Sequence, residues 1–263
     1  MRTTDWLDLT SDDFRSLDPA RTIAVLPIAA VEQHGPHLPV ATDTAIANGM
    51  IATVKKLLPD DLSVLFLPVQ AVGKSNEHIR SPGTITLDAE TLIRAWTQIG
   101  ESVARAGLRK LVIVNSHGGN VEVMGIVARE LRIRCQMLCV TTQWRRLGLP
   151  PDMFEPVETA HGIHAGDIET SLMLNFRPDT VKMDRAKNFV SNAVAMERDF
   201  EVLRATGPAA AFGWIAPDLN ADGACGDATK ATAEKGEAVA RYQAERFVTL
   251  LRDVERFNLA RLA

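Results

Sequence analysis

Acidic and imidazole side chains follow the apolar runs of this chain, at the points where those runs end. Glu32 and His34 come after the first run, and in extended backbone two residues that are two positions apart point to the same side. Asp43 lies where a helical segment begins, and His117 follows a later apolar run. Imidazole nitrogens together with carboxylate oxygens suit Zn²⁺, Mn²⁺ or Fe²⁺ better than Ca²⁺. The sequence therefore predicts a metal site built from these four side chains.

The same donors suffice for a site with two metal ions. A carboxylate can bridge two cations, so five protein ligands are enough to hold a pair of ions about 3.5–4 Å apart. Metal binding lowers the pKa of water to about 7, so a hydroxide shared by two ions is a nucleophile at neutral pH, and the pattern indicates metal-dependent hydrolysis. Asp43 has another interpretation as a helix N-cap, and Glu169 as an exposed charge on a later helix. The gathering of several donors at several strand ends favours the metal site.

Four apolar runs of five to seven residues, rich in Val, Ile and Leu, predict strands that are buried on both faces. They span residues 22–28, 62–68, 110–114 and 136–141. Segments with helical spacing lie between and after them, at residues 43–58, 87–106, 121–134, 166–176 and 229–254. Strand–helix–strand alternation predicts an α/β fold, a three-layer αβα sandwich with a mostly parallel central sheet. In such folds ligands bind beyond the carboxyl ends of the strands, which is where the candidate side chains lie.

The composition indicates one soluble domain over residues 1–263, since no linker rich in Gly, Ser or Pro divides the chain. The chain has 29 Lys and Arg against 33 Asp and Glu, a net charge of −4, which argues against binding of nucleic acid because phosphate neutralisation needs a basic stripe. Three Cys are too few for a disulfide framework and favour a reducing compartment. The sequence shows neither a signal-peptide pattern nor a membrane-spanning stretch, so we expect a cytoplasmic protein with no membrane partner.

Three blocks of the sequence resemble the creatininase (creatinine amidohydrolase) family. They are residues 32–39 (EQHGPHLP) followed by Asp43 and Thr44, residues 115–120 (NSHGGN) and residues 164–171 (HAGDIETS). Weaker matches at residues 82–84 and 226–236 occur in the expected order. The resemblance therefore covers nearly the whole chain.

The resemblance implies a creatininase-like αβα fold, a hexamer and a binuclear metal centre that hydrolyses amide bonds, often cyclic ones. The residues at the positions of the family's metal ligands are Glu32, His34, Asp43 and His117. Asp43 is the expected bridge between two divalent ions. Creatininase itself has a Glu at the position of Gly119, whereas branches of the family with the HGGN form use the Glu of the third block. We therefore expect Glu169 as the fifth ligand, with the alternative that a single ion binds and Glu169 lies beside it.

On the substrate side the resemblance implies a catalytic role for His164, which contacts the substrate and shuttles a proton, and for Glu169. Further residues expected at the substrate pocket are Ser75, Glu77, His78, Gly118, Trp144 and His161. Ordinary loop polarity is the alternative for the loop residues, and a place in the core is the alternative for the tryptophan. Creatininase has a Tyr at the position of Gly118 and a Trp-Asp pair at 160–161, so we expect a substrate other than creatinine.

These patterns predict an enzyme that uses two divalent ions (Zn, Mn or Fe) to hydrolyse the C–N bond of a small carboxamide, with a cyclic amide as the favoured substrate. A formamide deformylase or a small-peptide amidase on the same metal site is the first alternative. A metal-binding regulatory or scaffold protein that lacks turnover is the second. The sequence contains no G-x-S-x-G elbow, dinucleotide fingerprint or P-loop. The expected partners are the amide substrate and further copies of the chain in a homo-oligomer.

Overall fold

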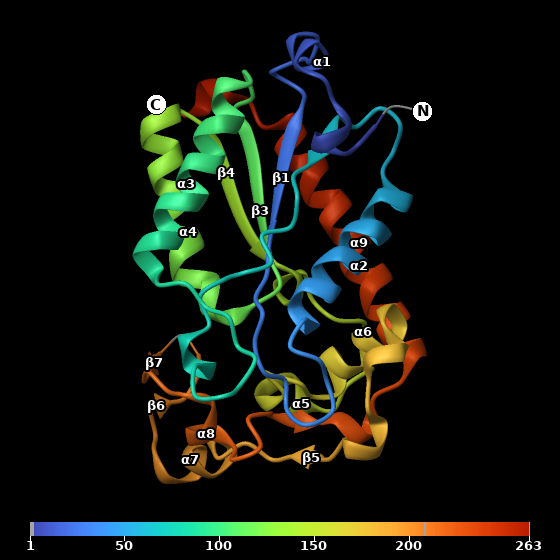
Figure 1. Ribbon diagram of the computed structural model, residues 1–263, viewed down its shortest axis with the longest axis vertical. Coiled ribbons are helices and arrows are strands. Elements are labelled where there is room, and N and C mark those ends of the chain that lie inside the picture. The colour runs from blue at the N-terminus through green and yellow to red at the C-terminus, as the bar shows by residue number, and fades with distance from the viewer. Residues whose placement is uncertain (1–2, 208, 263) are drawn as a thin grey trace.

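Four parallel strands form the central sheet of the computed structural model, which describes residues 3–207 and 209–262. In spatial order the strands are β2 (Val64–Phe66), β1 (Ile23–Ile28), β3 (Lys110–Asn115) and β4 (Leu138–Gln143). The register pairs Ile28 with Asn115 and Asn115 with Gln143, so β1, β3 and β4 end level with one another. The loops that leave these strands therefore start from one edge of the sheet, in the middle of the molecule (Figure 1).

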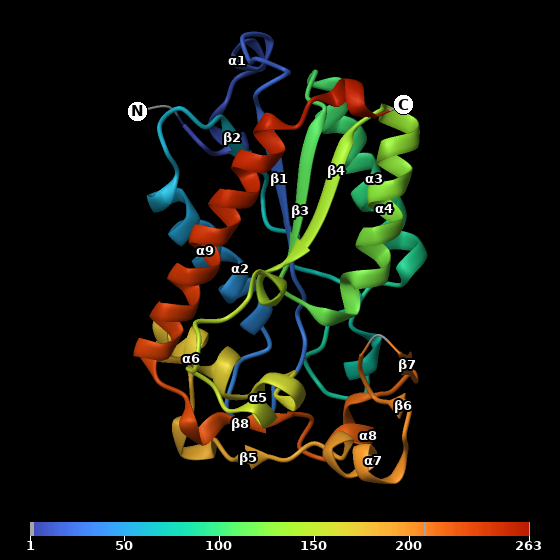
Figure 2. The ribbon, with the colours of Figure 1, turned by 180° about the vertical axis from the view of Figure 1, so that it is seen from behind.

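Helices cover both faces of the sheet, which confirms the predicted α/β architecture with a parallel central sheet (Figures 1 and 2). One face is covered by α2 (Thr42–Leu57), α6 (Asp167–Phe176) and α9 (Ala233–Arg256), and the other by α3 (Ala89–Arg105) and α4 (Val121–Cys135). Along β1, Ile23 and Val25 face the first core, whereas Ala24 and Leu26 face the second. Burying each large apolar side chain contributes roughly 1.5–3 kcal/mol. Because both faces are buried, the strands are continuous apolar runs rather than alternating ones.

Shorter elements gather beyond the carboxyl ends of the strands, at the end of the molecule opposite the two labelled chain ends (Figure 2). They are α5 (Pro156–His161), α7 (Ala193–Asp199), α8 (Ala216–Leu219), the antiparallel pair β5 (Asn188–Phe189) and β8 (Gly226–Asp227), and the parallel pair β6 (Leu203–Arg204) and β7 (Ala210–Ala211). Near the amino terminus lies α1 (Ser11–Arg15). The 3-10 helices are η1 (Trp6–Asp8), η2 (Asn76–His78), η3 (Gly118–Asn120), η4 (Trp144–Leu147), η5 (Pro178–Thr180), η6 (Met183–Arg185), η7 (Ala228–Lys230) and η8 (Leu259–Arg261).

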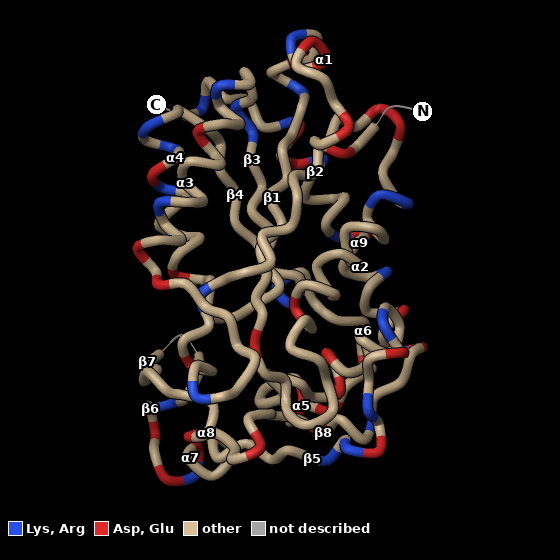
Figure 3. Tube along the Cα trace, in the orientation of Figure 1, with Lys and Arg blue, Asp and Glu red and all other residues tan. Residues whose placement is uncertain are grey.

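Charged residues of both signs are interspersed along the trace at both ends of the molecule (Figure 3). Within the described part of the chain, none of the helices combines the length and the apolar character that crossing a membrane requires. The two large buried apolar clusters lie on the two faces of the four-stranded sheet, and a smaller cluster contains Ala205, Leu219 and Cys225. The four remaining positions of the predicted domain, 1, 2, 208 and 263, lie outside the described residues.

Most observed boundaries differ from the predicted ones by one or two residues, and two of the differences have a clear local reason. Gln136 ends α4 in a left-handed backbone conformation (φ 54°), so β4 begins at Leu138 instead of residue 136. The last helix, α9, begins at Ala233 instead of residue 229 because η7 occupies the preceding residues and Thr232 caps the helix. The Thr232 side chain accepts a hydrogen bond from the backbone N–H of Lys235 (3.2 Å), which satisfies a donor that the first turn leaves free.

Replacing this cap tests where α9 begins. Thr232→Ala should lower the free energy of unfolding by about 1 kcal/mol, because an N–H of the first turn loses its acceptor. Thr249→Ala, at an exposed interior position of the same helix, is the matched control and should be neutral or slightly stabilising, since Ala has the higher helix propensity. Urea unfolding of both variants measures the difference. Equal stability of the two would show that Thr232 does not cap the helix.

Candidate active site

A cavity of about 1000 Å³ opens at the carboxyl edge of the sheet. The predicted site residues that line it are Glu32, Asp43, Glu77, His78, His117, Gly118, His164 and Glu169. His34 is 1 % exposed and lies behind this wall, in contact with Asp43 and Glu169. The structure therefore brings together all five side chains that the sequence predicts as metal ligands.

The loop after β1 places Glu32 and His34. Gly35 adopts a left-handed backbone conformation (φ 64°), which turns the chain back toward the sheet. The backbone N–H of Glu32 then donates to the carbonyl oxygen of Val40 (2.9 Å) and closes the turn. This closure brings the start of α2, with Asp43 in its first turn, beside the two residues that precede the turn.

Asn120 ties the loop after β3 to its neighbours. Its buried amide nitrogen donates to the carbonyl oxygen of Ala29 (3.0 Å) and to the side-chain oxygen of Asn115 (3.2 Å). Its amide oxygen accepts from the backbone N–H of Lys74 (2.9 Å). The Asn115 side chain also accepts from the backbone N–H of His117 (3.0 Å). The loops after β1, β2 and β3 are thereby held together around the imidazole of His117.

A buried carboxylate holds the helix that carries Glu169. Glu158, which is 5 % exposed, accepts hydrogen bonds from the backbone N–H groups of Asp167 (2.8 Å) and Asp227 (2.9 Å). The first of these groups is at the N-terminus of α6, where a negative charge is favourable. Oε2 of Glu169 accepts from the backbone N–H of Ala165 (2.6 Å), so its carboxylate is directed back toward the cavity.

The Asp43 carboxylate lies between two imidazoles. Its Oδ1 is 3.5 Å from Nε2 of His34, and its Oδ2 is 3.3 Å from Nδ1 of His117. Oε1 of Glu32 is 3.2 Å from the same nitrogen of His117. Oε2 of Glu169 is 3.8 Å from Nε2 of His34. The five side chains therefore form two groups that share Asp43, one with Glu32 and His117 and the other with His34 and Glu169.

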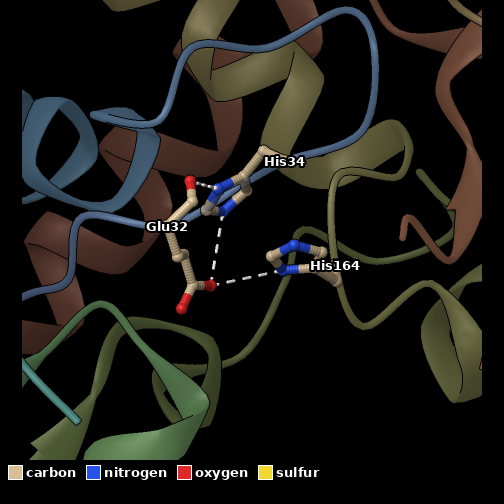
Figure 4. Close-up of side chains that lie close together, drawn as sticks. All are labelled: Glu32, His34 and His164. Atoms are coloured by element: carbon tan, nitrogen blue, oxygen red, sulfur yellow. Dashed lines mark hydrogen bonds and ion pairs between the residues drawn. The ribbon is translucent and has the colours of Figure 1, made fainter. Parts of the chain in front are cut away.

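Three imidazoles of the site each have one ring nitrogen within hydrogen-bond distance of a backbone carbonyl oxygen. The pairs are His34 Nδ1 with Glu32 (3.1 Å), His117 Nε2 with Lys74 (2.9 Å) and His164 Nε2 with Gln33 (2.8 Å). A carbonyl oxygen can only accept, so in the neutral imidazole this nitrogen carries the proton and the other one carries a lone pair. In Figure 4 the side chains of Glu32 and His34, from the loop after β1, converge with that of His164 from the facing segment.

Several buried polar atoms at the centre lack a hydrogen-bond partner among the described residues. They are Oε1 of Glu32, Nε2 of His34 and Oδ2 of Asp43. The other carboxylate oxygen of Glu32 is paired, because Ser75 donates to it. An unpaired buried polar atom costs about 1–3 kcal/mol, so three of them around one centre need a common partner. The atoms belong to groups of side chains that are close enough to hold a metal ion.

The buried carboxylates control the charge of the imidazoles. Burial disfavours the charged form of His34, but the carboxylates of Asp43 and Glu169 outweigh burial and raise its pKa to about 9. For His117, burial is likewise outweighed, mainly by Glu32, and the pKa is raised well above its usual value. Burial also disfavours charge on Glu32, yet the surrounding imidazoles hold its pKa well below the usual range. The centre therefore requires positive charge.

His164 stacks between two other imidazoles. Its ring centroid is 4.1 Å from that of His34 and 4.4 Å from that of His78. Burial lowers the pKa of His164, and burial together with His164 lowers the pKa of His78 to about 4. The amide nitrogen of Gln33 lies 2.7 Å from Nδ1 of His78 and 3.3 Å from Nε2 of His164. This amide nitrogen can donate to Nδ1 of His78, whereas Nε2 of His164 is held by the backbone carbonyl of Gln33.

Three predicted pocket residues do not line the cavity: Ser75 is fully buried and donates to Glu32, and the other two lie farther away. Trp144 is 4 % exposed and packs in the core against Phe247, with ring centroids 5.0 Å apart. His161 lines a separate cavity of about 140 Å³, and its Nε2 is 3.4 Å from a carboxylate oxygen of Glu197. Neither side chain is among the residues that line the large cavity.

Among the residues of the site that were not predicted are Gln33, Phe212 and Trp214. In an extended strand Gln33 would point away from its two neighbours, but the turn at Gly35 places its side chain within the site, where its Oε1 accepts from the Gly35 N–H (2.9 Å). Phe212 and Trp214 line the cavity from the segment after β7, which has neither helical nor strand periodicity in the sequence. Of these three residues, only Gln33 could have been found from the sequence, because it lies inside the family block at residues 32–39.

Gly119 occupies a position where no side chain fits. A Cβ atom there would collide with the carboxylate of Glu77, the carbonyl oxygen of Lys74 and the ring of His117. At Gly118, by contrast, a Cβ atom would meet none of the described atoms within 4 Å. The loop after β3 thus has no space for a Glu at position 119, and the carboxylate near His34 comes from α6.

Alanine substitutions at these two adjacent glycines test the close approach. Gly119→Ala should lower the free energy of unfolding by about 1–3 kcal/mol, because Glu77 or the His117 ring must move. Gly118→Ala, the matched control, should change it by less than about 0.5 kcal/mol. Thermal unfolding followed by circular dichroism measures both. If the two variants melt together, the loop relaxes freely and position 119 can accept a side chain.

The chain matches a family model described as "Creatininase: Creatinine amidohydrolase" over residues 7–251. It is 32% identical over 232 residues to the mycofactocin precursor peptide peptidase of Mycolicibacterium smegmatis, a match that covers 88% of this chain and 83% of the relative. It is 33% identical over 181 residues to the creatinine amidohydrolase of Pseudomonas putida, covering 62% of this chain and 67% of the relative. A solved structure of a mutant creatininase of Zn-Zn type has a TM-score of 0.73 at 25% identity, covering 96% of this chain and 98% of the other.

Proposed function

This chain belongs to the creatininase family, and on that premise we propose that it is a metal-dependent amidohydrolase that cleaves the C–N bond of a carboxamide. The observation that carries the proposal is the Asp43 carboxylate, whose two oxygens face two different imidazoles at 3.5 and 3.3 Å. Buried atoms of Glu32 and His34 beside it lack partners among the described residues. This donor set fits two divalent ions that share one carboxylate.

The two groups of side chains would each hold one ion. Glu32 and His117 with Asp43 make one site, and His34 and Glu169 with Asp43 make the other. Zn²⁺, Mn²⁺ and Fe²⁺ suit such a mixture of imidazole and carboxylate ligands. Bound ions of this kind supply Lewis acidity to an amide carbonyl and lower the pKa of water. The alternative of a single ion, with Glu169 beside it, predicts a different metal content and is tested below.

His164 is the residue that moves the proton. The carbonyl oxygen of Gln33 holds its Nε2–H, so Nδ1 faces the interior of the site, 3.6 Å from Oε1 of Glu32. In amide hydrolysis the oxygen of water joins the carbonyl carbon, the C–N bond breaks and the departing nitrogen takes up a proton. Nδ1 of His164 carries a lone pair, so it takes a proton from the attacking water and passes it to the departing nitrogen, a transfer that suits an imidazole. Glu169 stays oriented because Ala165 holds its carboxylate.

The cavity favours a substrate larger than a single small ring. Its volume of about 1000 Å³ is at the upper end of the range for small-molecule pockets. A short peptide amide therefore stands as the second candidate beside the cyclic amide expected from the sequence, and a relative named as a peptide peptidase supports it. A panel of hydantoins, lactams, creatinine, formamides and dipeptides separates the classes, because ring opening gives one product and the other reactions give two.

Two further expectations accompany the enzyme proposal. The chain is expected to form a homo-oligomer, a hexamer by its family resemblance, and to be cytoplasmic. Light scattering after size-exclusion chromatography tests the first expectation. Protein that binds metal but hydrolyses no member of the amide panel would support the regulatory or scaffold alternative instead.

Metal removal and ligand substitution test the proposed site. Dialysis against a chelator should abolish amide hydrolysis, and added Zn²⁺ or Mn²⁺ should restore it. Elemental analysis should find about two ions per chain, and about one in Glu169→Gln and in His117→Ala, because each change removes a ligand of one site. His161→Ala is the control for metal content, since that imidazole lies outside the cavity. Full activity in metal-free protein would contradict the proposal, and one ion in the unaltered chain would favour the single-ion alternative.

Substitution of His164 separates proton transfer from metal binding. His164→Ala should lower kcat about 10²–10⁴-fold, because the departing nitrogen loses its proton donor. The metal content should stay as it is in the unaltered chain, because the five proposed ligands remain. Loss of an ion from this variant would identify His164 as a ligand and contradict its role as the proton carrier.

A further inference from the structure

Arg146 is an exposed cation on the wall of the cavity that also contains His117 and His164. It lies in η4, directly beyond the end of β4. Within the described ranges of the chain, its guanidinium forms neither an ion pair nor a hydrogen bond. An arginine without a protein partner at the mouth of a cavity is positioned to bind an anion.

The two residues before Arg146 hold this turn in place. Trp144 is 4 % exposed and packs in the core. Arg145 donates to the carbonyl oxygens of Thr159 (2.6 Å) and Gly162 (2.9 Å), at the end of α5. Because the first two residues of η4 are anchored, its third residue presents the guanidinium from an ordered backbone, which lowers the entropic cost of binding a ligand.

Two other charged side chains of this part of the wall, those of Lys74 and Asp218, already have hydrogen-bond partners. Lys74 donates to the side chain of Asn76 (2.5 Å). Asp218 accepts from the backbone N–H of Ile215 (2.9 Å). Glu122 lies in the first turn of α4, where the helix N-terminus favours a carboxylate. Among the described residues of the wall, the guanidinium is therefore the cation with no partner.

An apolar surface lies on the wall of the same cavity. Its members are Ile163, Phe212 and Trp214. The Trp214 ring is fixed, because its N–H donates to the carbonyl oxygen of Ala205 (2.9 Å). All three side chains pack against a small buried cluster that includes Leu219 and Cys225. The cavity thus combines a free cation with a rigid apolar surface.

We propose that Arg146 binds a free carboxylate of the substrate, so that the enzyme selects short peptides or N-acylamino acids with an apolar side chain and an unblocked carboxyl terminus. The guanidinium fork matches a carboxylate in shape and can form two parallel hydrogen bonds with it. The apolar side chain packs on Phe212 and Trp214, and the scissile amide lies toward Asp43 and His164. This inference rests on the proposed amidohydrolase function and adds the substrate class.

The test compares two ligands that differ only in the charge of one group. The dipeptide Leu-Phe and its C-terminal amide are offered to the Zn²⁺-loaded protein, with kcat and KM measured where they are cleaved and Kd measured by calorimetry on His164→Ala. The parent should prefer the free acid about 10- to 100-fold, mainly in KM or Kd, as expected for a charge-assisted hydrogen bond pair. Arg146→Gln should reduce this preference to near unity, and Arg146→Lys should retain part of it.

Arg129→Gln is the matched control, because it removes an exposed positive charge on α4 that does not line the cavity. It should keep the full preference for the free acid. Equal binding of the two dipeptides, no binding of either, or a preference that survives in Arg146→Gln would each overturn the inference. Selective binding without cleavage by the parent would leave the inference standing and count against hydrolysis of this dipeptide. Cleavage without selectivity would support the amidohydrolase and contradict the role of Arg146.

Discussion

Repulsion between buried carboxylates is the constraint around which the molecule is organised. Glu32 and Asp43 are buried, and Glu169 points at the same centre. Burying a negative charge is unfavourable unless a positive charge lies beside it. The imidazoles of His34 and His117 face these carboxylates, which raise the pKa values of both rings and so favour their charged forms. The centre is thus a place for positive charge, and the surrounding loops must hold the carboxylates there against their mutual repulsion.

Buried polar side chains hold these loops in place through hydrogen bonds. Asn120 joins three loops with its single amide, and Glu158 fixes the start of α6 through two backbone N–H groups. Both lie one layer behind the groups that face the cavity, so neither is available for chemistry. The turn η4 is built in the same way, because Trp144 and Arg145 anchor it and Arg146 lines the cavity. Rigid positioning of this kind is what a charged centre requires.

Much of the fold could be predicted because short-range patterns determine it. Buried parallel strands are continuous apolar runs, and the donors Glu32, His34 and His117 follow such runs closely, so their convergence follows from the sheet. The metal-binding roles of these residues stay a prediction, although the structure brings them together. What could not be predicted depends on three-dimensional packing. Trp144 follows a strand yet enters the core, while Trp214 reaches the cavity from a segment without periodicity, and neither outcome has a local signal.

The order of strands in the sheet has a consequence for how the site assembles during folding. The strand β1 pairs with both β2 and β3, so the contact between β1 and β3 closes a loop that contains β2 and α3. Glu169 lies still farther along the chain, in α6, beyond β4 and α5. Contacts between segments so distant in the chain form slowly, because loop closure costs entropy before the contacts repay it. The charged centre therefore depends on the contacts that are most distant in the chain, and a nascent chain that ends before α6 lacks the helix that completes the surroundings of Glu32 and Asp43.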